Sequence, residues 1–101
     1  MGENNMAKSI INGDDEYCFL CKQLGCPNYG TEVHHMIFGT AKRKLADQDG
    51  LTVHLCNYHH VMLHRHGEHK EELQQLAEKT WLEHYNKTIE DFIQRYGRNY
   101  L

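Results

Sequence analysis

Apolar residues recur with a helical period in the last third of the chain. Between residues 73 and 85 they fall at spacings of three and four, which predicts an amphipathic helix with a charged outer face. These positions are Leu73, Leu76, Ala77, Trp81 and Tyr85. A second helix is predicted from Thr88, a suitable N-cap, to Gly97, which would end it. Because Trp81, Tyr85, Phe92 and Tyr96 follow this spacing, we expect them in the core.

Shorter apolar segments precede these helices. Residues 31–38 and 51–55 are predicted strands, and the first would carry His34 and His35 to opposite faces. His60 and His64 are four residues apart, which places them on one face of a helix that should end at Gly67. The predicted order in this part of the chain is strand, strand, helix.

The predicted organisation has three parts. Residues 1–13 are polar and aperiodic, which indicates a flexible tail, with Ile10 and Ile11 placed against the body. Residues 14–67 would form the core domain. Residues 68–101 would form a helical extension packed on it.

Length and composition narrow the class of protein. A chain of 101 residues with 40% hydrophobic content suffices for one small domain, and a bound metal would support its modest core. We see neither a signal peptide nor an apolar run of roughly 20 residues, so we expect a cytoplasmic protein with no membrane partner.

A formal net charge of −3 disfavours a broadly basic nucleic-acid binder. The only local basic patch is residues 42–44, and it includes Arg43.

Two pairs of soft ligands predict a structural zinc site. Cys18 and Cys21 form a CxxC pair, and Cys56 and His59 repeat that spacing downstream. His60 is an alternative to His59 as the fourth ligand. Buried free thiols are the competing interpretation, and it is weaker because both pairs have matched spacing. The fourth cysteine, Cys26, is assigned to packing or loop structure.

A second cluster contains histidines from the first predicted strand and from the predicted helix that ends at Gly67. Its members are His34, His35, His60 and His64. So many imidazoles in two short segments indicate metal ligation or acid and base chemistry.

Here the chain resembles the HNH nuclease family, also called the ββα-metal or His-Me finger fold. The residues that carry the resemblance are the run 32–37, Glu-Val-His-His-Met-Ile, and the run 56–64, which reads as a Cys-x-x-Cys-His-x-x-x-His ending with His59 in place of the second cysteine. Residues 35–39, 42–44, 50–56 and 96–101 look more narrowly like small phage-encoded HNH-type proteins of Gram-positive bacteria. The resemblance covers about residues 16–101.

The resemblance implies an α+β protein with a ββα-metal core, a zinc knuckle and two C-terminal helices. It implies a metal-dependent DNA endonuclease in which His34, His60 and His64 bind a catalytic divalent metal and His35 is the general base. Magnesium, manganese, nickel and zinc are all candidate ions. Arg43 would neutralise phosphate charge. The expected partners are DNA and other phage proteins, in the cytoplasm of a bacterial host.

One departure from the family pattern stands out. The asparagine in the middle of the HNH pattern usually holds in place the loop next to the strand that carries the base. This asparagine has no counterpart near residues 47–50. Asp47 or Asp49 would take that role, or the loop is held differently.

Two other functions remain open at this point. One is a non-catalytic zinc module that binds nucleic acid or a phage replication or packaging protein. The other is a pair of zinc ions that serve folding alone, in which case His35→Ala would lower stability. An active nuclease needs a structural zinc and a second, exchangeable ion, whereas a binding module needs only the first.

Overall fold

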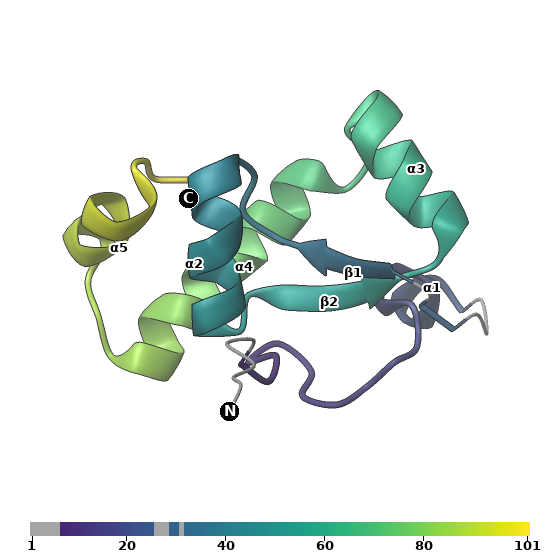
Figure 1. The fold of residues 1–101 in the computed structure, drawn as a ribbon, viewed down its shortest axis with the longest axis horizontal. Coiled ribbons are helices and arrows are strands. Elements are labelled where there is room, and N and C mark those ends of the chain that lie inside the picture. The colour runs from purple at the N-terminus through teal and green to yellow at the C-terminus, as the bar shows by residue number, and fades with distance from the viewer. Residues whose placement is uncertain (1–6, 26–28, 31) are drawn as a thin grey trace.

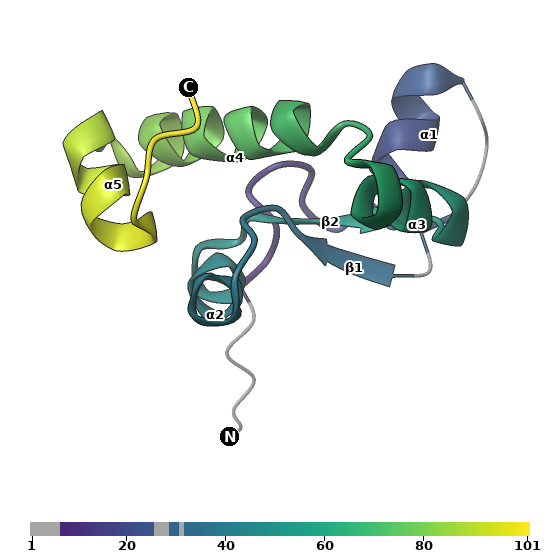
Figure 2. The ribbon, with the colours of Figure 1, turned by 90° about the horizontal axis from the view of Figure 1, so that it is seen from above.

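The computed structural model describes residues 7–25, 29–30 and 32–101. In this part the chain is a small α+β protein with a two-stranded antiparallel sheet and helices around it (Figure 1). The elements in chain order are α1 (Phe19–Leu24), β1 (Glu32–His35), α2 (Thr40–Asp49), β2 (Thr52–Leu55), α3 (Asn57–His66), α4 (Lys70–Tyr85) and α5 (Ile89–Tyr96). Figure 2 shows α4 extending along the molecule between α3 and α5.

The sheet brings the two histidine segments together. β1 and β2 pair antiparallel, with His34 opposite Val53 and Glu32 opposite Leu55. Successive residues of a strand point to opposite faces, so Glu32 and His34 share one face. His34 is buried, whereas His35 is only partly buried. Both predicted strands are present, and α3 follows β2 directly and ends before Gly67, as expected.

The connection between the strands contains a helix that the predicted order omits. α2 spans Thr40–Asp49, a segment with few apolar positions, and Gly50 ends it in the left-handed conformation at φ 75°. Glycine is required there for a second reason, since a Cβ atom would lie 2.4 Å from the carbonyl oxygen of Lys8. The basic residues 42–44 therefore lie on a helix.

The N-terminal residues in the described part run beside the end of α2. The Ala7 N–H donates to the Asp47 carbonyl at 2.8 Å, and the Ile10 N–H donates to the Gly50 carbonyl at 2.9 Å. Ser9 Oγ donates to the Thr52 carbonyl at 2.6 Å. Within the segment 1–13, residues 1–6 lie outside the described residues, and the rest contacts α2 and β2.

Both predicted C-terminal helices are present, and the second begins and ends where the sequence predicts. Thr88 and Asp91 form a reciprocal capping box at the start of α5, and Gly97 ends that helix with φ 90°. Trp81, Phe92 and Tyr96 are buried, as expected, and Tyr85 packs against them with part of its surface exposed.

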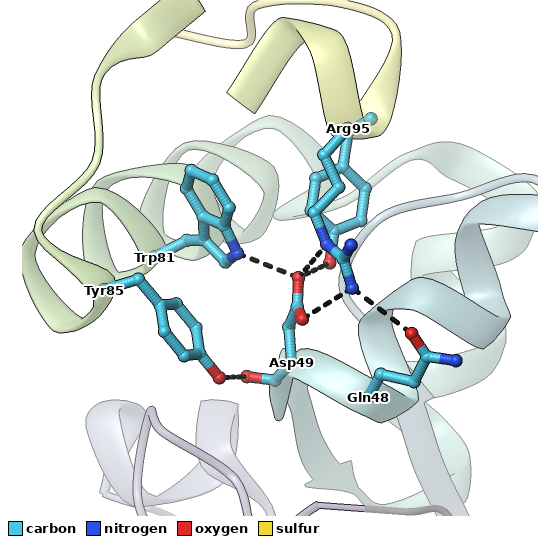
Figure 3. A network of polar contacts seen from close by, with 6 residues as sticks. Gln48, Asp49, Trp81, Tyr85 and Arg95 are labelled. Atoms are coloured by element: carbon cyan, nitrogen blue, oxygen red, sulfur yellow. Dashed lines mark hydrogen bonds and ion pairs between the residues drawn. The ribbon is translucent and has the colours of Figure 1, made fainter. Parts of the chain in front are cut away.

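Asp49 attaches these helices to the rest of the molecule (Figure 3). Its buried carboxylate accepts hydrogen bonds from Trp81 Nε1 at 2.8 Å, from Tyr96 Oη at 2.6 Å and from two nitrogens of Arg95 at 2.6 and 2.8 Å. Its backbone carbonyl accepts from Tyr85 Oη at 2.9 Å. The end of α2 is thereby joined to both α4 and α5.

No helix in the described residues is both long enough and apolar enough to cross a membrane.

Candidate metal centres

Three cysteines and one histidine converge between α1, β2 and α3. Cys18 precedes α1, Cys21 lies within it, and Cys56 and His59 lie at the start of α3. All four are buried or nearly so. The structure selects His59 for this cluster, because its Nδ1 faces the three sulfur atoms and His60 belongs to a different group.

The spacing of the four donor atoms matches tetrahedral zinc. His59 Nδ1 lies 3.5 Å from Cys18 Sγ and 3.4 Å from the Sγ atoms of Cys21 and Cys56, and the last two sulfurs are 3.8 Å apart. With Zn–S of about 2.3 Å and Zn–N of about 2.0 Å, tetrahedral geometry gives edges of about 3.8 Å for S···S and about 3.5 Å for S···N. The cluster could therefore hold a metal such as zinc.

The protonation state of His59 suits this use. Burial lowers the pKa of the His59 imidazole, and the nearby His69 lowers it further. The neutral ring, which is the form that binds metals, is therefore favoured at neutral pH.

A second group of histidines joins β1 to α3. His34, His60 and His64 each offer a ring nitrogen, and the three atoms lie within 4.8 Å of one another. The Nε2 atoms of His60 and His64 are 3.1 Å apart. Octahedral ligation at about 2.1 Å would place neighbouring nitrogens about 3.0 Å apart, so this pair fits a shared divalent ion.

His34 carries the clearest sign that a ligand belongs in this group. Its Nε2 atom is buried and has no hydrogen-bond partner among the described residues. A buried polar atom without a partner is costly, and an ion bound at this nitrogen would remove the cost. Burial, with the neighbouring His60 and His64, lowers the pKa of His34 to about 3, so its ring is neutral at physiological pH.

Glu32 contacts one of these histidines. Its carboxylate contacts Nδ1 of His60 and accepts a hydrogen bond from Asn57 Nδ2 at 3.0 Å. The contacts with Asn57 and His60 lower the pKa of Glu32. A carboxylate on one ring nitrogen makes the other a better metal ligand and fixes the ring in place. Here the other nitrogen is the one that faces His64.

His35 and Arg43 are among the residues that line the same cleft as the three histidines. The cleft has a volume of about 380 Å³, and its polar lining includes His34, His35, Arg43, His60 and His64. His35 Nε2 lies 2.5 Å from Asp47 Oδ1. That carboxylate favours a proton on Nε2 and leaves Nδ1 with a free lone pair.

An aromatic side chain forms one wall of the cleft. The ring of Phe38 stacks on His64 with centroids 5.5 Å apart, and it meets His34 edge to face at 5.6 Å. This wall shields part of the imidazole group from water. Burial lowers the pKa of His64, and His60 lowers it further.

The structure thus brings together the residues that the sequence singled out, in two neighbouring groups. Cys26 lies outside the described residues. Sequence reasoning missed the role of Glu32, although its position two residues before His34 on a strand places both on one face. It named Asp47 only as a possible loop anchor. Because the sequence did not predict α2, it gave no reason to expect the Asp47 carboxylate beside His35.

Comparison with known proteins adds no identification, since no protein-family model, curated protein or solved structure matches the chain.

Proposed function

We propose that this chain is a metal-dependent endonuclease of the ββα-metal type that hydrolyses DNA phosphodiesters. The observation that carries the proposal is the shared cleft, in which a carboxylate-held histidine and an arginine lie beside three histidines suited to one divalent ion. β1 and α3 supply these histidines, with β2 between them in the chain, and this strand, strand, helix order is the one that the family resemblance implies. Asp47 would take the anchoring role of the missing asparagine.

The roles of the residues follow from their positions. His34, His60 and His64 would hold the ion, and a bound divalent ion would polarise the phosphodiester and stabilise the developing negative charge. His35 would accept a proton at Nδ1 from a water molecule as the water oxygen bonds to phosphorus. The bond from phosphorus to the leaving oxygen then breaks, and that oxygen takes a proton from solvent. Asp47 would stabilise the imidazolium formed on His35.

Arg43 would bind a non-bridging oxygen of the same phosphate. A guanidinium is always charged and presents several donors to an oxyanion. Its exposed position in the lining of the cleft supports this role.

The knuckle supports a second candidate function, a zinc module that binds nucleic acid or a phage protein without turnover. Four protein ligands would leave a zinc ion no free coordination position, so this site alone would account for folding and not for catalysis. Metal content separates the two functions. A nuclease should keep one ion through mild chelation and bind a second reversibly, whereas the binding module should hold only the first. Elemental analysis before and after dialysis against a weak chelator gives the count.

Cleavage itself tests the proposal. Purified protein should cut supercoiled plasmid or single-stranded DNA with at least one of magnesium, manganese, nickel and zinc. Folded His35→Ala should not cut. His66→Ala is a matched control, because His66 is exposed on α3 and does not belong to the residues that line the cleft. Absence of cutting with every ion would leave the binding module as the better account.

A further inference from the structure

We propose that Lys70 and Arg98 form a phosphate-binding subsite that extends the histidine cleft onto the C-terminal helices. The subsite would hold backbone phosphates of the DNA strand beside the bond that is cut. The inference rests on the proposed function and specifies how the substrate lies. It assigns the C-terminal extension a binding role in addition to support.

Lys70 lies at the edge of the histidine cleft. It is the exposed first residue of α4, and its Nζ is 5.0 Å from the centroid of the Phe38 ring. Phe38 forms the wall of the cleft and stacks on His64. A phosphate next to the one at the histidines would therefore lie within reach of this ammonium group.

Lys70, which lies beside Phe38 of the cleft, also lines a second hollow. It has a volume of about 340 Å³, and its lining is Gly67, Lys70, Glu71, Gln74, Arg98 and Tyr100. The Arg98 guanidinium lies 4.8 Å from the centroid of the Tyr100 ring, which gives the long side chain a defined resting position. Two cations, an amide and a single carboxylate suit a phosphate group better than an apolar ligand.

In the part of the chain that the structure describes, the cations of this region have no carboxylate partner. Among the described residues, Lys8, Lys22 and Arg95 each have an acidic side chain within 4.0 Å. Within that same part of the chain, no such ion pair involves Arg43, Lys70 or Arg98. In a protein of net charge −3, these cations make a local positive region, since Lys70 lies over the Phe38 ring and Arg43 lines the same cleft as Phe38. DNA phosphates are the complementary partner.

Equilibrium binding of DNA tests the subsite without requiring turnover. Fluorescence anisotropy would measure the Kd of a short fluorescein-labelled duplex and of the matching single strand at several salt concentrations, with no divalent ion added. The variants are Lys70→Ala, Arg98→Ala and the double variant. Lys79→Ala is the matched control, because it removes one exposed charge from the same helix α4 outside the hollow.

We expect each subsite variant to bind the duplex about tenfold more weakly at roughly 50 mM salt and to lower the salt slope by about 0.9. Lys79→Ala should match wild type. Thermal melts should show all variants folded, since the replaced side chains are exposed. Lys70→Ala and Arg98→Ala variants that bind with the wild-type Kd and slope would overturn the subsite.

Cleavage assays separate this inference from the proposed function. If wild type cuts DNA and the double variant cuts with unchanged KM, the subsite is wrong and the nuclease stands. If wild type binds DNA through Lys70 and Arg98 and never cuts, the subsite stands and the nuclease is wrong.

Discussion

His35 in β1 and Asp47 in α2 are joined by a contact of 2.5 Å between Nε2 and Oδ1. The two residues are twelve positions apart, and the helix between the strands brings them together. The contact favours a proton on Nε2 and leaves Nδ1 as the nitrogen that can accept one, and His35 is among the residues that line the cleft. This arrangement of His35 and Asp47 is the main support for the proposed role of His35 as general base in hydrolysis.

Loss of the Asp47 carboxylate should slow DNA cleavage. We expect Asp47→Ala to reduce the rate about 10- to 100-fold, because His35 would lose its preferred tautomer and the charge that stabilises its protonated form. Initial rates of plasmid nicking measure the effect. Lys44→Ala, an exposed change on the same helix, should leave the rate unchanged. Equal rates for Asp47→Ala and wild type would remove Asp47 from the mechanism.

Neutralising Glu32 should weaken binding of the exchangeable ion. Glu32→Gln keeps the size of the side chain and removes the charge that faces His60 Nδ1. Carboxylates behind metal-binding histidines contribute about 10- to 100-fold to affinity, so a loss in that range is expected. Isothermal titration of manganese into protein whose cysteine cluster has first been loaded with zinc gives the affinity. Unchanged manganese affinity would mean that Glu32 serves only the fold.

Asp49 should be among the most sensitive positions for stability. Asp49→Ala leaves the buried donors of Trp81 and Tyr96 unpaired and removes the counter-charge of Arg95. Loss of one partner from a buried charged network costs about 3–5 kcal/mol. Urea denaturation should show a decrease of that size in the free energy of unfolding. Glu90→Ala, an exposed change on α5, should stay within about 0.5 kcal/mol of wild type, and a similarly small effect at Asp49 would contradict the network.

Buried Glu78 should make stability fall as pH rises. Burial raises its pKa above 4.5, against the opposing effect of the Tyr100 N–H, which donates to Oε1 at 2.6 Å. A carboxyl with a raised pKa in the folded state stabilises the fold fully below its unfolded pKa, and this contribution is lost as pH rises through the folded value. Glu78→Gln keeps the acceptor and cannot ionise.

The free energy of unfolding of wild type should therefore fall, relative to that of Glu78→Gln, as pH rises from about 4.5 to 8. Urea denaturation at several pH values measures the difference, and exposed Glu83→Gln is the control. A difference between Glu78→Gln and wild type that does not change with pH would show that Glu78 titrates normally.

Local signals in the sequence were enough to predict several elements and ligands. Thr88 and Gly97 mark the two ends of α5, and they could be predicted because capping depends on single residues. The CxxC spacing predicted members of the cluster that could hold a metal such as zinc, because two thiolates one turn apart can reach the same ion. α2 was missed because its ten residues have few apolar side chains and bury only part of their surface. The contacts of Asp47 with His35 and of Asp49 with Trp81 depend on that helix, so no local pattern could predict them.

The most direct test of the central claim is the rate of plasmid nicking as manganese is added to protein whose cysteine cluster has first been loaded with zinc. The account predicts a rate that rises and saturates with manganese, is abolished in folded His35→Ala, and needs much more manganese in His64→Ala. No nicking at any manganese concentration, or equal nicking by His35→Ala, would contradict it.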